Sequence, residues 1–555
     1  MTRRYERMED VPDNILNKLG RFVSNVGGKT FVLRGLPPEM HGGVLARYSR
    51  ASTGLQLTLI NEFFDDNGDP IEGKGSELMD RVLNAFGDDS VGELEGIHVG
   101  IEDISQIGTK FIEDRRIGGS PIEQSTRYVR YDKKDEQGRW RYLRPKEVFE
   151  AGFLDKFEIV NNRTFEVYSE GIIKLSEHFK KQLPRDSFKI TIERNGQRTE
   201  VNKDNLNSDN EKSAFNTAYN FTIRCAALDV GRCILPSSTL THLGVFGNGR
   251  YFSNLISFMK SNELTESKER AVELEGELKK VIPTFIKRNA ANPQLAHINK
   301  QMRNLASDLF RGITPRDDRV TLVERAGVYN DEAVSSILFP YTNISLQQIV
   351  DIIRNLRDEK KLQIMETYIG SRSSRRDRTG RGIEAGYPLT FDLVGCFAEY
   401  RDLERHRILT QQRQDLTTQL GFIMPSEMEE IGLKREVEEV VALMDNLNTD
   451  LKHAGIEQAA QYATLFNHRM RFMLGMNLRE FQHLVELRTQ PAGHFSYRSM
   501  AMEMADKVKE KYAWTEIFLN FVNYSDPGNK ISRAREQSRI AGKNLARNID
   551  GSLDL

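Results

Sequence analysis

The fold is decided by two similar segments, IEDISQIGTKFIEDRRIGGS at residues 101–120 and LVGCFAEYRDLERHRILTQQ at residues 393–412. In the first half, residues 97–104 alternate apolar and polar side chains, which is typical of a half-buried strand, and residues 105–116 return to helical spacing. The pattern therefore predicts a strand followed by a helix.

The second half repeats this order. An apolar segment at residues 389–397 leads into a basic helix that we expect to run through Arg407. A long helical region is predicted from there to Lys511.

A second pair of similar segments follows in each half. The first half has GRCILPSSTLTHLGVFGNGRYFSNLISFM at residues 231–259, and the second has AQYATLFNHRMRFMLGMNLREFQHLVELR at residues 460–488. Each contains an Asn-x-Arg triplet between apolar segments, at 248–250 and 477–479. Two such similarities in the same order predict an α+β chain of two tandem, diverged copies of one module that form a pseudo-symmetric dimer.

Changes in composition set the boundaries of these parts. The first copy is predicted at residues 43–312 and the second at 319–525, with a linker around Pro315–Asp318. An N-terminal extension is predicted at 1–42 and a basic C-terminal tail at 526–555.

The first copy carries further local signals. Residues 43–64 and 77–86 have apolar residues at helical spacing, and residues 263–287 form a charged amphipathic helix pattern. The Asn-Gly pair inside FKITIERNGQRTEV, residues 188–201, predicts a β-hairpin that we interpret as an insertion near residues 186–210.

Composition excludes several classes of protein. The chain has 555 residues, several times a domain of roughly 150 residues. Its 79 Lys and Arg against 80 Asp and Glu give a net charge of −1, which argues against a protein that mainly coats nucleic acid. Cys225, Cys233 and Cys396 are too few for a disulfide framework and wrongly spaced for zinc, so we expect a reducing cytoplasm and no metal site. Neither a signal peptide nor an apolar run of about 18 residues is present, so we expect no membrane segment.

Basic residues are the first candidates for chemistry. Arg405, His406 and Arg407 are consecutive on the predicted helix, where side chains splay by about 100° per residue. They either surround a ligand, since arginine suits phosphates and electron-rich rings, or form a solvated face. The basic stretch at residues 371–381 is either a phosphate site or a mobile loop. Its lack of interleaved aromatic residues is typical of the loop.

The segment EQSTRY, residues 123–128, has alternating polar residues and follows a turn at Gly118 and Gly119. Glu123, Ser125 and Arg127 share one face of an extended loop and can point toward one polar ligand. The alternative is a solvated turn with a Glu–Arg ion pair. Arg488 lies on an otherwise apolar helix, where it either serves a ligand or snorkels to solvent.

Taken together, these motifs resemble the flavin-dependent thymidylate synthases, whose signature is Arg-His-Arg followed by a loop with Glu-x-Ser-x-Arg-Tyr. The resemblance is divided between the copies. The first copy keeps the loop but has Asp114 and Arg115 in place of the first Arg and the His, and Met259 in place of the last arginine of the Asn-x-Arg helix. The second keeps Arg-His-Arg and that last arginine but has lost the loop, and it has Gln461 where the first copy has Arg232.

The resemblance implies roles for individual residues. The implied catalytic residues are Arg488 and Ser125. The implied substrate-binding residues are Glu123, Ser125, Arg127, Arg232, Arg405 and Arg488. The implied cofactor-binding residues are Arg405, His406, Arg407, Asn477, Arg479, His483, Asn248, Arg250, Asn254, Ser90 and Glu93.

The implied enzyme methylates dUMP to dTMP, with FAD passing a hydride, methylenetetrahydrofolate supplying one carbon and NADPH reducing the flavin. Because the losses are complementary, we hypothesise one composite site per chain, in which the second copy supplies Arg-His-Arg and Arg488 and the first supplies Glu123, Ser125 and Arg127. The reciprocal site, with Asp114 and Met259, should be dead.

Assembly and substrate are implied less directly. Family members are homotetramers, so a homodimer that gives a pseudo-tetramer is implied, with no membrane or nucleic-acid partner. Asp402 replaces a glutamine of the family pattern, and a carboxylate beside an anionic substrate is unfavourable. The alternatives are therefore an inactive flavin- or nucleotide-binding homologue and an enzyme for another pyrimidine nucleotide. A third alternative is a nucleic-acid binder that uses residues 371–381.

Overall fold

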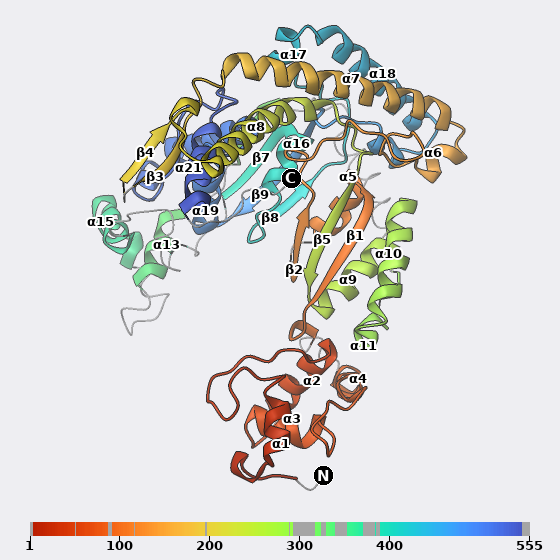
Figure 1. Cartoon of the computed structure of the whole chain (residues 1–555), viewed down its shortest axis with the longest axis vertical. Coiled ribbons are helices and arrows are strands. Elements are labelled where there is room, and N and C mark those ends of the chain that lie inside the picture. The colour runs from red at the N-terminus through yellow and green to blue at the C-terminus, as the bar shows by residue number, and fades with distance from the viewer. Residues whose placement is uncertain are drawn as a thin grey trace. The chain divides into compact units, whose positions relative to one another are not determined.

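The computed structural model describes residues 4–49, 51–86, 92–115, 117–194, 197–287, 289–291, 317–323, 329–338, 352–369, 383 and 389–546. The chain forms two compact units (Figure 1). The first comprises Met1–Gln124, Pro145–Glu147 and Leu240–Ile313, and the second comprises Ser125–Arg144, Val148–Thr239 and Thr314–Leu555.

A three-stranded antiparallel sheet lies at the centre of the first unit. Its order is β1 (Ile97–Ser105), β5 (Leu240–Gly247) and β2 (Gly119–Glu123). The strand and helix predicted from residue 97 are β1 and α5, and the helices predicted at 43–64 and 77–86 are α2, α3 and α4. The helices of this unit are α1 (Asp13–Leu19), α2 (Pro38–Tyr48), α3 (Leu55–Phe63), α4 (Lys74–Phe86), α5 (Gln106–Glu113), α9 (Gly249–Lys260), α10 (Thr265–Leu278) and α11 (Pro283–Ile286).

The second unit is built on a four-stranded antiparallel sheet. Its order is β6 (Val320–Leu322), β7 (Leu389–Cys396), β9 (Arg469–Met476) and β8 (Thr410–Arg413). Its helices, with α6 at a boundary of the unit, are α6 (Lys146–Glu150), α7 (Leu154–Gln182), α8 (Asp209–Gly231), α13 (Tyr329–Leu338), α15 (Asp358–Ile369), α16 (Phe397–Leu403), α17 (Ser426–Glu430), α18 (Lys434–His453), α19 (Leu478–Arg488), α20 (Phe495–Lys511) and α21 (Ala534–Ala546).

The two halves of the chain repeat one order of elements. The series β1, α5, β2, α6, α7, β5 and α9 corresponds to β7, α16, β8, α17, α18, β9 and α19, and the first copy has β3, β4 and α8 in addition between α7 and β5. In both sheets the last strand of the series pairs with the two earlier ones. Asn248 and Asn477 then cap α9 and α19, and each Oδ1 accepts the backbone N–H three residues later, at 2.8 and 3.0 Å. The repeated order and the repeated cap confirm the α+β fold and the two diverged copies.

Equivalent residues of the two copies meet inside the second unit. Pro236 and Leu465 hold the same position in the two aligned segments, and they form an antiparallel bridge. The residues that flank them exchange backbone hydrogen bonds of 2.8 and 2.9 Å. Exchanging the equivalent residues of the two copies turns each of these bonds into the other. The pairing therefore has local two-fold symmetry. The pseudo-symmetric dimer of whole modules stays a prediction.

The compact units cut across the sequence copies. Helix α7 of the first copy packs on α8 and on α18 of the second copy, and Arg163 Nη2 donates to Glu439 at 2.9 Å. Phe157, Phe165 and Ile172 recur on one buried stripe of α7, as an amphipathic helix requires. The predicted boundaries of the copies in the sequence stay predictions. No helix of the described ranges is long and apolar enough to cross a membrane.

The prediction that Arg405, His406 and Arg407 are helical was wrong. Helix α16 ends at Leu403, and the chain turns with the His406 N–H bonded to the Leu403 carbonyl at 3.2 Å. The chain must then extend, because Thr410 begins the ladder between β8 and β9. The region predicted as helical up to Lys511 therefore contains two strands.

Proline also divides the helix predicted over residues 263–287. Helix α10 ends at Leu278, and α11 begins at Pro283. Proline has no N–H and clashes with the preceding turn, so it is tolerated at the start of a helix but not inside one.

The predicted hairpin is present. Strands β3 (Ile190–Arg194) and β4 (Gln197–Val201) pair from Ile190 to Arg194, while the Asn-Gly turn lies outside the described residues. Strand β3 and helix α8 pack against α21 (Figure 1), where Thr191 Oγ1 and Ser538 Oγ are 3.2 Å apart. The predicted tail thus contains a helix that packs on the predicted insertion. The basic stretch at 371–381 lies outside the described residues.

Candidate active site

A hydrogen-bonded chain of Glu480, His406 and Arg488 lies beside the Asn-x-Arg helix. The cap residue Asn477 starts α19, which carries Glu480 in its first turn and ends at Arg488. His406 Nδ1 lies 2.8 Å from Glu480 Oε1, and Arg488 Nε donates to His406 Nε2 at 2.9 Å. Burial, and then the charge of Arg488, lower the pKa of His406 to about 3. His406 is therefore neutral, with Nδ1–H donating to Glu480 and Nε2 accepting from Arg488.

Arg127 of the first copy is held by a carboxylate on α8. Its Nε and Nη2 donate to the two oxygens of Asp229 at 2.7 and 2.9 Å. Burial alone would raise the pKa of Asp229, but Arg127 holds that pKa well below its ordinary value. This forked pair fixes the plane of the guanidinium.

A second buried pair joins the copies. Arg232 Nη2 donates to Asp402 Oδ2 at 3.0 Å. Burial opposes the charge of Asp402, yet Arg232, followed by Arg127, lowers the pKa of Asp402 well below its usual range. Both groups are therefore charged, and each neutralises the other.

Tyr497 and His494 connect these groups. The guanidinium carbons of Arg127 and Arg488 lie 5.9 and 5.7 Å from the centroid of the Tyr497 ring. His494 Nε2 donates to the Asp229 carbonyl at 2.9 Å, and burial followed by the charge of Arg232 lowers the pKa of His494 to about 3. The predicted residues Arg127, Arg232, His406 and Arg488 therefore belong to one network in the second unit.

Two guanidinium groups of this network have no carboxylate partner. Arg405 is exposed and Arg488 half-buried, and within the described ranges neither forms an ion pair. Arg405 lies close enough to lower the pKa values of Asp402 and Arg488. The network therefore presents uncompensated positive charge, which is the chemistry that binds an anion.

Other predicted residues of the second unit lie at its rim. Arg407 and His483 are exposed, and the His483 ring centroid is 5.5 Å from that of His406. Arg479 is half-buried beside the cap. Ser125 Oγ accepts the Arg127 N–H at 3.3 Å.

The structure places the remaining predicted residues in the first unit. Glu123 is buried with its carboxylate 3.8 Å from Lys110, and exposed Arg250 donates to Glu93 at 2.8 Å. Asn248 caps α9 and Asn254 is exposed. Ser90 lies outside the described residues.

The first-copy counterparts of the Arg-His-Arg and Arg488 positions look different. The guanidinium carbon of Arg115 lies 3.6 Å from the centroid of the Phe258 ring, and Met259 is completely buried in α9. A methionine has no N–H donor, so Met259 cannot form the equivalent of the bond from Arg488 to His406.

Sequence reasoning missed four members of the network: Asp229, Glu480, His494 and Tyr497. Asp229 precedes Arg232 by three residues, and Glu480 directly follows the Asn-x-Arg triplet. Their positions next to these motifs were the signal that could have identified them. His494 and Tyr497 gave no signal, because their contacts are made by tertiary packing alone.

Comparisons with known proteins show the family of this chain. Residues 44–284 and 386–512 match the model of a family described as thymidylate synthase complementing protein. A UPF0159 protein of Chlamydia muridarum is 34% identical over 546 residues, covering 94% of this chain and 97% of the relative. UPF0159 proteins of Chlamydia pneumoniae and Thermoplasma acidophilum are 33% and 30% identical, over 92% and 90% of this chain and 94% and 99% of theirs. The chain therefore belongs to the thymidylate synthase complementing protein family, the flavin-dependent thymidylate synthases, as two fused and diverged copies.

Proposed function

We propose that this chain is an enzyme that methylates dUMP to dTMP with FAD, methylenetetrahydrofolate and NADPH, at one composite site in the second unit. The observation that carries the proposal is the uncompensated pair Arg405 and Arg488 beside a network that draws Arg127 and Arg232 from the other copy. Phosphate and an electron-rich pyrimidine are the ligands that such a site favours.

Arg488 is the proposed catalytic group, with Ser125 beside Arg127. Neutral His406 accepts from Nε of Arg488, which fixes the plane of the guanidinium and leaves its outer N–H donors for a ligand. A guanidinium in this position stabilises negative charge that develops on the uracil ring. Arg405, which is exposed and unpaired in the described part of the chain, is the proposed phosphate ligand.

The rim residues fit an anionic, flat cofactor such as FAD. Arg407 and His483 are exposed beside the network, and a guanidinium and an imidazole ring are groups that contact diphosphates and planar rings. His406 itself is buried with both nitrogens occupied, so we assign it to the positioning of Arg488 rather than to direct cofactor contact. When bound, the flavin supplies the hydride chemistry.

Asp402 does not oppose dUMP as the substrate. Its carboxylate is neutralised by Arg232 at 3.0 Å, so it adds no net repulsion toward a phosphate. The same pairing occupies a donor that the resemblance assigns to the nucleotide, which is the observation that favours the alternatives: an inactive homologue, or an enzyme for another pyrimidine nucleotide.

The proposed assembly is a homodimer, equivalent to four modules. Sedimentation equilibrium of the purified chain should give twice the mass of one chain, and a monomer that remains fully active would contradict this part of the proposal.

Colour and turnover test the function. The purified protein should be yellow, release FAD on denaturation and convert dUMP to dTMP when all three co-reactants are supplied. A yellow protein without turnover would identify the inactive homologue, and turnover of another pyrimidine nucleotide alone would identify the second alternative. A colourless protein that cannot be reconstituted with FAD would refute both flavin-dependent readings.

A further inference from the structure

A cavity of about 590 Å³ in the second unit is separate from the candidate active site. It lies at the end of the sheet where Cys396 of β7 pairs with Arg469 of β9, whereas Asn477 and the Arg-His-Arg network follow the opposite end of β9. None of the network's arginines or histidines lines it. Its volume falls within the roughly 300–1,000 Å³ of small-molecule sites.

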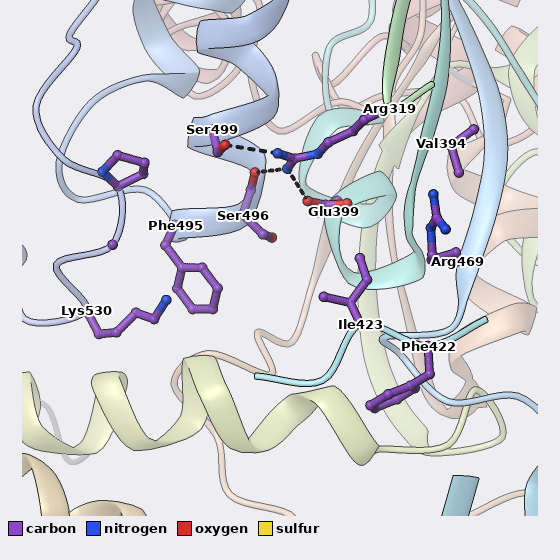
Figure 2. Close-up of a pocket in the computed structure, with 12 residues that line it drawn as sticks. Arg319, Val394, Glu399, Phe422, Ile423, Arg469, Phe495, Ser496, Ser499 and Lys530 are labelled. Carbon is purple, nitrogen blue, oxygen red and sulfur yellow. Dashed lines mark hydrogen bonds and ion pairs between the residues drawn. The ribbon is translucent and has the colours of Figure 1, made fainter. Parts of the chain in front are cut away.

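Two apolar walls face each other across this cavity. Figure 2 shows Phe495 on one side and Ile423 with Phe422 on the other. The second wall is held by backbone pairing, since the Ile423 N–H donates to the Asn467 carbonyl at 3.0 Å and Phe422 bridges to His468. A flat ring of a ligand gains contact with an aromatic face and an aliphatic side chain at once.

Two arginines at the cavity are fixed by carboxylates. Arg319 Nη2 donates to Glu399 at 2.9 Å and its Nη1 donates to Ser499, as Figure 2 shows. Arg469 pairs with the exposed Asp317 at 2.6 Å. These pairs shape the cavity and largely cancel their own charge.

Lys530 is the third cation at the cavity, and its ion pair with Glu427 is the longest of the three. Its Nζ lies 3.3 Å from the centroid of the Phe495 ring, and Glu427 is 3.6 Å away, which is longer than a hydrogen bond. Only 15% of its side chain is exposed, and burial, opposed by Glu427, lowers the pKa of Lys530. An anion beside this desolvated ammonium would form a charge-assisted hydrogen bond that the described residues do not supply.

We propose that this cavity binds a small organic anion that carries a flat aromatic ring, with the anionic group on Lys530 and the ring between Phe495 and Ile423. The lining chemistry supports both parts of the assignment: an ammonium whose ion pair with Glu427 is longer than a hydrogen bond, and apolar walls on two sides. This is a second site, independent of dUMP methylation.

A matched pair of fluorescent probes tests the proposal. 8-Anilinonaphthalene-1-sulfonate carries a sulfonate, and N-phenyl-1-naphthylamine has the same rings without it. The full-length protein should bind the anionic probe about tenfold more tightly than the neutral one. Lys530→Gln should remove this preference, whereas Lys530→Arg should keep most of it. Phe495→Leu should weaken both probes.

The control is Lys280→Gln, because Lys280 is an exposed lysine that pairs with Glu277 in the first unit. All variants should show the wild-type melting temperature, which excludes probe binding to unfolded chain. Equal affinity for the anionic probe in Lys530→Gln and Lys280→Gln would overturn the proposal. Displacement of the probe by dUMP would also overturn it, since the probe would then report the arginine network.

Discussion

Arg232 of the first copy and Asp402 of the second form a buried ion pair, with Nη2 3.0 Å from Oδ2 and only 2% and 9% of the side chains exposed. The carboxylate that departs from the family pattern thus has a dedicated partner in the other copy. The two charges are coupled, because a buried arginine and a buried aspartate are tolerated only together.

Removing one member of this pair should destabilise the second unit. Asp402→Ala leaves the Arg232 charge buried without its partner, so we expect the free energy of unfolding to fall by about 3–5 kcal/mol. Urea unfolding followed by circular dichroism measures this loss. Asp402→Ala combined with Arg232→Met should recover most of it, and a double variant as unstable as the single one would show that the pair is not coupled.

Glu480 should control the tautomer of His406. In Glu480→Leu the imidazole loses its acceptor, so Arg488 loses its fixed plane and kcat should fall by about ten- to a hundredfold, which corresponds to a lost hydrogen bond of roughly 1–3 kcal/mol. Glu480→Gln keeps an acceptor oxygen and should stay within about threefold of the wild type. Nitrogen-15 NMR should find His406 of the wild type protonated on Nδ1 alone. A proton on Nε2 would contradict the hydrogen-bonded chain of Glu480, His406 and Arg488.

Stability should decline in mild acid because of two histidines. Burial lowers the pKa values of His406 and His494 to about 3, below the unfolded value of about 6.5. Their stabilising effect is therefore complete above about pH 6.5 and is lost as the pH falls toward 3, by about 1.4 kcal/mol per pH unit for each histidine. Asp229 and Asp402 have lowered pKa values and add loss only below about pH 4.

Urea unfolding between about pH 7.5 and 5 measures this slope. His494→Gln keeps an N–H for the Asp229 carbonyl but cannot titrate, so it should show a shallower slope than the wild type. A stability that does not change across this range would contradict the assignment of both histidines as neutral and buried.

The sequence predicted the elements that depend on local pattern. Strand β1, helix α5 and the hairpin β3-β4 follow from alternation, helical spacing and an Asn-Gly pair, and the duplicated Asn-x-Arg triplet lies at the start of α9 and of α19. The helix expected through Arg407 failed because strand pairing of β8 with β9 overrides a helical pattern, and pairing is not visible within a short window.

The candidate site was predicted in part for the same reason. Arg127, Arg232, His406 and Arg488 came from motifs, whereas their partners Asp229 and Tyr497 are brought in by packing between helices distant in sequence. Complementary losses in the two copies predicted residues that would combine, but they did not predict which carboxylate would hold which arginine.

Arg488 and Met259 occupy equivalent ends of α19 and α9, and only the substitution of Arg488 should impair catalysis. Arg488→Ala should lower kcat/KM for dUMP at least about a hundredfold, since it removes a charge expected to act in the transition state. Arg488→Lys should be nearly as poor, because lysine lacks the fork and the Nε donor to His406.

The control substitution at Met259 must preserve the volume of this buried side chain. Met259 is completely buried, so Met259→Ala would open a cavity that costs about 2–5 kcal/mol, whereas Met259→Leu conserves volume. Met259→Leu should leave steady-state kinetics within about twofold of the wild type. Similar losses of kcat/KM from Arg488→Ala and Met259→Leu would count against a single working site.

The number of dUMP molecules bound per chain tests the central claim most directly. Calorimetric titration of the flavin-loaded protein should give one site per chain. Arg405→Gln should abolish or severely weaken this binding, and Arg115→Gln, the same substitution at the first-copy arginine that stands in the place of His406, should leave it unchanged. Two equivalent sites per chain, or binding that depends on Arg115 as strongly as on Arg405, would contradict a composite site that uses the arginines of the second copy.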